Sequence, residues 1–121
     1  MRRVVVTGMG IVSSLGVGLK KNWCDLLAGN SGITAIENFD VSDLPAKIAG
    51  QVPKGSIADG LFTADDWVPV KDQRRMDDFI IYGLCAAQQA FEDSGWRIDS
   101  EEDSWRTGVL IGSGIGGLPE I

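Results

Sequence analysis

Two segments of the chain are continuously apolar, rich in β-branched residues and closed by glycine. They are residues 3–8 (RVVVTG) and residues 107–112 (TGVLIG). An apolar run without alternating polar positions is typical of a strand that is buried on both faces of a parallel or mixed sheet. We therefore predict one such strand in each segment, covered by helices.

Two further segments place apolar residues at helical spacing. Residues 18–28 predict a helix that ends at Gly29-Asn30, and its stripe consists of Leu19, Trp23, Leu26 and Leu27. Residues 72–94 predict a longer helix that ends at Gly95, which suits a left-handed terminal position. This helix carries two adjacent stripes, formed by Met76, Ile80, Leu84, Ala87 and Phe91 and by Phe79, Gly83, Ala86 and Ala90. So wide an apolar face indicates a helix packed between two layers.

The remaining segments are rich in turn-forming residues. Residues 47–52 alternate enough to predict a short strand, and residues 61–68 predict a brief helix with Thr63 as its N-cap. Residues 96–106 are acidic and are expected to form an exposed connection. The order strand, helix, short strand, helix, strand indicates an α/β fold, and 121 residues fit a single domain.

The net charge and the N-terminal residues argue against several classes of function. A net charge of −6 argues against general nucleic-acid binding, which needs a basic face. Arg2-Arg3 and the apolar stretch after them mimic a signal peptide, but glycines interrupt the stretch and no small-residue cleavage site follows. The stretch is also shorter than the roughly 20 residues that span a bilayer. We therefore expect a cytoplasmic protein without a membrane partner.

The chain has no histidine and two cysteines. An activated thiolate needs a helix N-terminus, a cationic neighbour or a histidine base. Cys24 and Cys85 both fall in the middle of a predicted helix, Cys24 beside Asp25 and Cys85 among apolar residues. Their spacing gives neither a zinc motif nor a CxxC motif. The sequence therefore predicts no catalytic residue, no metal site and no cofactor.

Two glycine-rich turns follow the predicted strands and allow two interpretations. Gly112-x-Gly114-x-x-Gly117 matches a dinucleotide-binding fingerprint, in which glycines let the backbone approach a pyrophosphate. The other turn, Gly8-x-Gly10-x-x-Ser13, departs from that fingerprint at its last position. Both turns could instead simply reverse the chain in a crowded α/β domain, so nucleotide binding stays an alternative.

Taken together, these segments resemble the N-terminal part of β-ketoacyl-acyl carrier protein synthases, and most of all the type II elongating enzymes of bacterial fatty-acid synthesis. Each motif is weak alone, but the ordered set is specific and covers nearly the whole chain. Residues 53–70 fit the pattern poorly. The matching text is Arg2-Arg-Val-Val-Val-Thr-Gly-Met-Gly10, Trp23-x-x-Leu-Leu-Ala-Gly29, Ser31-Gly-Ile33, Phe39-Asp40, Gln73-Arg-Arg-Met-Asp77, Phe79, Tyr82-Gly83, Asp93-Ser-Gly95 and Ile111-Gly-Ser-Gly-Ile-Gly-Gly117.

The resemblance implies a thiolase-like fold, in which two similar α/β halves pack into layers of helix and sheet. Residues 1–121 would be an incomplete N-terminal segment of the N-terminal domain. The family works as a homodimer and elongates acyl chains by decarboxylative Claisen condensation with malonyl carrier protein. In the family pattern the catalytic cysteine and two histidines lie beyond residue 121, so we expect the segment alone to be inactive.

The resemblance also implies two functional sites within the chain. Basic residues at the positions of Lys71, Arg74 and Arg75 grip the acidic helix of acyl carrier protein, and cations at a helix start would oppose its dipole. The alternative is a solvated helix start that is paired with acidic neighbours, namely Asp72, Asp77 and Asp78. Ile115 would line the acyl pocket, or would be an ordinary core residue.

Two other functions stay open on the sequence. The chain could be a non-catalytic module that binds acyl carrier protein, or a nucleotide-binding fragment. The sequence also does not separate a fatty-acid enzyme from a related polyketide ketosynthase.

Overall fold

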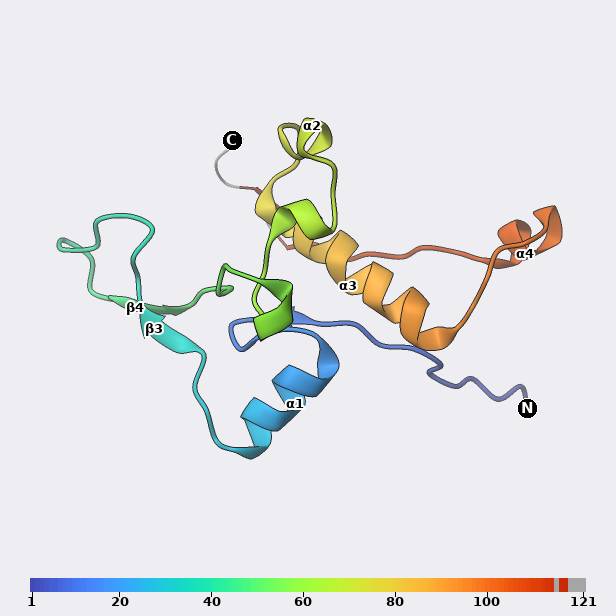
Figure 1. The fold of residues 1–121 in the computed structure, drawn as a ribbon, viewed down its shortest axis with the longest axis horizontal. Helices are drawn as coiled ribbons and strands as arrows, with labels where there is room; N and C mark the ends of the chain where they lie inside the picture. The colour runs from blue at the N-terminus through green and yellow to red at the C-terminus, as the bar shows by residue number, and fades with distance from the viewer. Residues whose placement is uncertain (115, 118–121) are drawn as a thin grey trace.

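The computed structural model describes residues 1–114, 116 and 117. Its long central helix has a hairpin arm on one side and a short helix on the other (Figure 1). The helices are α1 (Leu19–Leu27), α2 (Val70–Gln73), α3 (Asp78–Ser94) and α4 (Glu101–Arg106). The strands are β1 (Val12–Ser13), β2 (Gly16–Val17), β3 (Ile33–Ala35) and β4 (Ile48–Gly50). Two 3-10 turns, Ile57–Asp59 and Ala64–Asp66, precede α2.

The strands form two separate antiparallel pairs, β1 with β2 and β3 with β4. The first pair has the register Val12 to Val17, and the second matches Ile33 to Gly50. The predicted mixed sheet is therefore not assembled within the described residues. The sequence predicted β4 within residues 47–52 but not β3, because Ile33–Ala35 lies among turn-forming residues.

The apolar segments at residues 3–8 and 107–112 are extended but are not strands. This corrects the prediction of a buried strand in each of them. Val4 is 93% exposed and Leu110 is 100% exposed. A central strand of a parallel sheet needs hydrogen-bonding neighbours and a covering layer on each face. The described residues do not provide those neighbours, so both segments stay unpaired.

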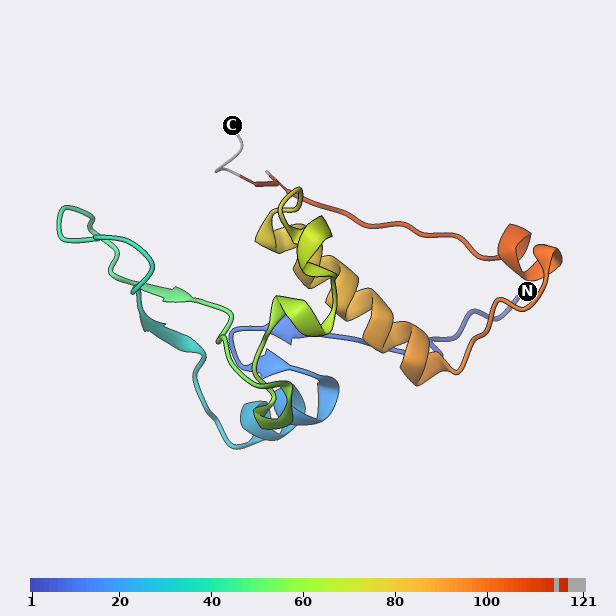
Figure 2. The same ribbon diagram turned by 45° about the horizontal axis from the view of Figure 1, so that its top comes forward.

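Both segments nevertheless run in the direction opposite to α3, but only the end of the first lies beside the helix, while residues 107–112 are separated from it (Figure 2). The Met9 amide donates to Asp93 Oδ2 at 2.9 Å, and the Ile11 amide donates to Gln89 Oε1 at 3.4 Å. At the other segment, Trp96 Nε1 donates to Thr107 Oγ1 at 3.0 Å. The order of extended segment, helix and extended segment is that of an α/β unit, and the two outer segments run in the same direction.

Helix α3 begins at Asp78, six residues later than residue 72, where the sequence predicted its start. Residues 74–77 separate it from α2. Its C-terminus was predicted correctly, because Gly95 takes the left-handed conformation with φ 65°. The buried face of α3 is not the predicted one: Ile81 and Cys85 are buried and belong to neither predicted stripe, whereas Ile80, Leu84 and Phe91 are exposed.

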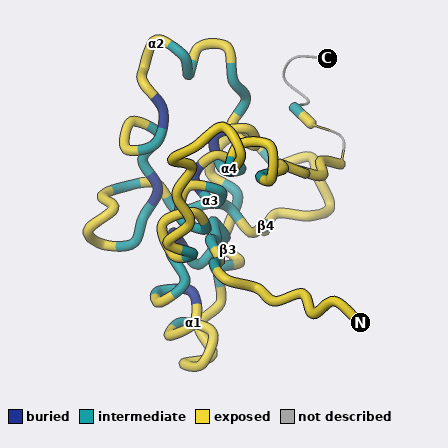
Figure 3. The backbone as a smooth tube through the Cα atoms, turned by 90° about the vertical axis from the view of Figure 1, so that its right-hand side faces the viewer, coloured by how far each residue is buried: buried dark blue, intermediate teal, exposed yellow. Residues whose placement is uncertain are grey.

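The buried core is small and lies where α3 meets the loop before α2. Its members are Val17, Phe62, Val68, Ile81 and Cys85. The ring of Phe62 packs edge-on against Tyr82, with 4.8 Å between ring centroids and 76° between planes. Figure 3 shows these buried positions as short dark stretches in a mostly exposed tube. Few apolar side chains therefore hold the elements together.

Helix α1 follows the prediction for residues 18–28 and is fixed by a buried polar side chain. Asn22 Nδ2 donates to the carbonyls of Gly16 at 3.1 Å and Gly18 at 2.9 Å, while its Oδ1 accepts from Ser13 Oγ. These bonds satisfy the amide in the core, where an unpaired polar group would be costly. Asn22 thereby ties α1 to the β1–β2 pair.

Helix α4 lies within the acidic segment that was predicted to be an exposed connection, and this segment is mostly exposed. The Ser100 side chain accepts from the Asp103 amide at 3.1 Å, and Glu101, Glu102 and Asp103 occupy the first turn. A serine cap followed by acidic residues is a favourable helix start. The brief helix predicted at residues 61–68 is a 3-10 turn, and the Thr63 hydroxyl donates to the Gly55 carbonyl rather than capping it. Within the described residues, no helix combines the length and apolar character that crossing a membrane requires.

Candidate functional site

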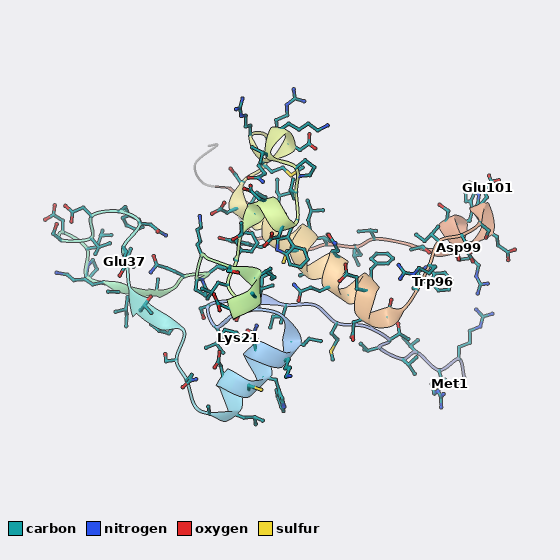
Figure 4. The ribbon with its side chains drawn as sticks, viewed as in Figure 1. Met1, Lys21, Glu37, Trp96, Asp99 and Glu101 are labelled. Atoms are coloured by element: carbon teal, nitrogen blue, oxygen red, sulfur yellow. The ribbon has the colours of Figure 1, made fainter. Side chains whose placement is uncertain are left out.

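Three cationic residues cluster around α2, and we call Lys71, Arg74 and Arg75 the basic corner. All three are exposed. Gln73 anchors the corner, because its Nε2 donates to the Val68 carbonyl and to Asp65 Oδ1, both at 2.8 Å. Figure 4 shows nitrogen-tipped side chains projecting outward at α2.

The described residues contain two ion pairs, and neither includes the basic corner. They join Lys21 to Asp25 at 2.6 Å and Lys54 to Asp78 at 3.5 Å. The alternative in which acidic neighbours neutralise the basic corner is therefore not formed among the residues described. The three cations face solvent and are accessible to an acidic partner.

The position of Arg74 corrects the expectation that these cations oppose a helix dipole. Arg74 does not lie at a helix start: it is the C-cap of α2, and Arg75 follows it. Cations near a helix C-terminus are favoured by the dipole rather than opposed to it. The helix dipole therefore gives no reason to expect an acidic partner. A partner is supported instead by the exposure of the basic corner and by its lack of ion pairs among the described residues.

A second group of residues lines a cavity of about 540 Å³ at the start of α3. Its walls are Met76, Asp77, Asp78, Phe79, Tyr82, Gly116 and Gly117. The Tyr82 hydroxyl donates to Asp78 Oδ2 at 3.3 Å. Burial, and next the negative charge of Asp78, raise the pKa of Tyr82 to about 12, so the phenol stays protonated near neutral pH.

The cavity brings together residues that sequence reasoning did not connect. Asp77 and Gly117 are far apart in the sequence but lie in contact, and the cluster of Lys54, Asp78 and Tyr82 was also missed. The one feature of the sequence that could have indicated these contacts was an aspartate just before an apolar helix. Ile115 lies outside the described residues, although Gly114 and Gly116 on either side of it are described.

Neither cysteine lies at a helix N-terminus. Cys85 is 0% exposed, burial raises the pKa of its thiol, and Gln89 Nε2 donates to its sulfur at 3.2 Å. Cys24 is exposed in the middle of α1. Among the described residues, no group of three or more histidine, cysteine, aspartate or glutamate side chains is arranged to hold a metal ion.

The glycines of the first turn are explained by packing against α3. A Cβ atom on Gly8 would overlap the Ala90 carbonyl oxygen, and one on Gly10 would overlap the Ala86 carbonyl oxygen. Glycine is needed wherever two backbones approach this closely. This turn therefore faces a helix backbone at the positions where a nucleotide-binding turn would face a phosphate.

The comparisons with known proteins agree with this arrangement. Residues 1–120 match the family described as "Beta-ketoacyl synthase, N-terminal domain". The chain is 53% identical to 3-oxoacyl-[acyl-carrier-protein] synthase 2 of Rhizobium meliloti, over 100% of the chain and 29% of the relative. It is 50% identical to the protein of the same name from Vibrio cholerae, over 99% of the chain and 27% of the relative.

A solved structure is also similar. It is titled "The ishigamide ketosynthase/chain length factor", with a TM-score of 0.64 and 34% identity. The similarity covers 84% of this chain and 23% of that one. The chain therefore spans less than a third of the length of these relatives. The fold is an incomplete part of the layered α/β architecture of ketosynthases, and the chain belongs to the β-ketoacyl synthase family, whose N-terminal domain it matches.

Proposed function

We propose that the chain is the N-terminal segment of a 3-oxoacyl-acyl carrier protein synthase that elongates fatty acyl chains. The observation that carries this proposal is 53% identity across the whole chain to a relative of that name. In the proposed reaction, a cysteine thiolate supplied by the rest of the enzyme attacks the thioester of acyl carrier protein, takes the acyl group and releases the carrier's thiol. Malonyl carrier protein loses carbon dioxide, and its carbanion attacks the acyl thioester, which forms the new carbon–carbon bond and releases the thiolate.

The segment contributes structure and recognition to this reaction rather than reacting groups. The basic corner would receive the acidic helix of acyl carrier protein, both acyl-loaded and malonyl-loaded. The unpaired segments at residues 3–8 and 107–112 would join the sheet of the complete enzyme, which we propose to be a cytoplasmic homodimer. Neither cysteine has the setting of an activated nucleophile, so the isolated segment would not condense acyl groups.

A hybrid enzyme tests this function directly. In the hybrid, the chain replaces the 121 matching residues of the full-length relative that is 53% identical. We expect the purified hybrid to convert acyl and malonyl carrier protein into 3-oxoacyl carrier protein, and the isolated chain to give no product. A folded hybrid without activity would contradict the proposal, and so would turnover by the isolated chain.

Separate measurements test the two alternative functions, a carrier-protein-binding module and a nucleotide-binding fragment. A well-dispersed amide spectrum of the isolated chain, together with binding of carrier protein, would favour a self-standing binding module. Saturable binding of NADPH would favour the nucleotide-binding fragment, although the packing of Gly8 and Gly10 against α3 speaks against a phosphate at that turn.

We further propose that Ile115 lines the acyl pocket and helps to set chain length. Truncating it to alanine removes about three methylene equivalents, which in a hydrophobic pocket changes discrimination by roughly 10-fold or more. In the hybrid, Ile115→Ala should therefore shift the ratio of kcat/KM between long and short acyl primers. Unchanged ratios across the primer series would leave Ile115 with the role of an ordinary core residue.

A further inference from the structure

Asp77 stands at the N-cap position of α3 but does not cap the helix. Its backbone is extended, with φ −69° and ψ 156°, and its side chain makes no capping hydrogen bond. An aspartate at this position ordinarily accepts a bond from an amide in the first helical turn. Here the carboxylate instead lies against Gly117, in the wall of the cavity described above.

Gly116 and Gly117, which we call the glycine turn, differ in what opposes a side chain at each position. A Cβ atom on Gly117 would overlap the carboxylate of Asp77. At Gly116 a Cβ atom would meet the Phe79 ring at an ordinary 3.7 Å, but the backbone has φ 83°, which L-residues rarely adopt. At position 117 the opposition comes from a contact with Asp77, and at position 116 it comes from the backbone alone.

The contact joins two segments that are distant in the sequence. Asp77 precedes α3, and the glycine turn follows the extended segment that runs in the direction opposite to the same helix. The neighbouring Asp78 is engaged by Lys54 and by the Tyr82 hydroxyl, so Asp77 is the carboxylate that lies against the turn. The position of the glycine turn relative to α3 therefore depends on where the Asp77 side chain sits.

We propose that Asp77 is a positioning residue for the glycine turn and, through that turn, for the wall of the acyl pocket. The effect on the pocket rests on the function proposed above, whereas the contact itself does not. Displacing a wall by about 1 Å can change a rate by up to roughly 100-fold, so a side chain that touches no substrate can still affect chain-length preference.

Paired substitutions in the hybrid enzyme test the contact. Gly117→Ala should lower the thermal midpoint by roughly 5 °C, because the added methyl forces the Asp77 carboxylate out of its position. Asp77→Ala in the same molecule should restore most of that loss, because it removes the overlapping atoms. Asp77→Asn keeps the volume of the side chain and should not restore it, so the two variants separate volume from charge.

Gly116→Ala is the matched control. Its cost comes from a left-handed backbone, so Asp77→Ala should not relieve it. Rescue at position 117 but not at position 116 supports the proposal. Equal rescue at both positions, no loss in Gly117→Ala, or strictly additive losses would overturn it.

The ratio of kcat/KM for long and short acyl primers then tests the pocket. Gly117→Ala should change this ratio by roughly tenfold, and Asp77→Ala should bring it back toward that of the unsubstituted hybrid. An unchanged ratio, with rescue of the thermal midpoint, would confine Asp77 to a structural contact and overturn the positioning role. An inactive hybrid would count against the proposed function, while its thermal midpoints would still decide the contact.

Discussion

Truncating Phe62 to alanine should destabilise the protein by about 3–5 kcal/mol, the usual cost of removing a buried phenylalanine. Phe62 is 3% exposed, belongs to the small core and packs edge-on against Tyr82. It also pairs with Lys54, which connects the loop before α2 to the residues around it. Single domains are stable by only about 5–15 kcal/mol, so this loss is a large share of the total.

Phe39 provides the matched control for this prediction. It lies in the hairpin arm and is 59% exposed, so Phe39→Ala removes the same atoms without opening a cavity. We expect Phe39→Ala to change stability by no more than about 0.5 kcal/mol. Urea unfolding followed by tryptophan fluorescence measures both variants, in the hybrid enzyme and in the isolated chain. Equal unfolding midpoints for the two variants would show that the core is not centred on Phe62.

Reversing the charge of Arg74 and Arg75 to glutamate should weaken binding of acyl carrier protein by roughly tenfold or more at low salt. The physical reason is that exposed charges mainly steer encounter and fix orientation, and like charges then face each other across the interface. The dependence of affinity on salt should become flatter, because fewer favourable charge pairs remain to be screened. Titration of the hybrid with acyl carrier protein over a series of salt concentrations measures both effects.

Arg2 and Arg3 provide the control for the charge reversal. They are also adjacent and exposed, so reversing them changes the net charge by the same amount at the N-terminus. We expect this control to retain its affinity, which separates a local docking surface from a general charge effect. Unchanged affinity in the Arg74→Glu, Arg75→Glu variant at low salt would end the proposal for the basic corner.

Local periodicity predicted the helices better than the strands. The stripe of Leu19, Trp23 and Leu26 located α1, and Gly95 located the end of α3, because both signals act over one or two turns. The start of α3 was missed, since Arg74 and Arg75 fit a helix but α2 ends there. The strands at residues 3–8 and 107–112 did not form, because a strand depends on partners that lie elsewhere in a fold.

For the candidate site, too, the sequence predicted some features and the structure decided others. The ordered motifs identified the family and pointed to Lys71, Arg74 and Arg75, since these features are written in the order of the residues. They could not show whether Asp72, Asp77 or Asp78 would pair with the cations, because that depends on side-chain positions after folding. The structure showed that Asp78 is engaged by Lys54 and that Asp77 lies against Gly117.

The sequence by itself determined the family, the two main helices and the absence of histidine, because each of these follows from residue identity or from spacing within a few turns. The tertiary structure alone decided which apolar runs are covered, which cations stay unpaired among the described residues, and which side chain lies against Gly117. Those properties arise from atoms that are distant in the sequence and meet only in the fold, where burial and steric overlap are settled.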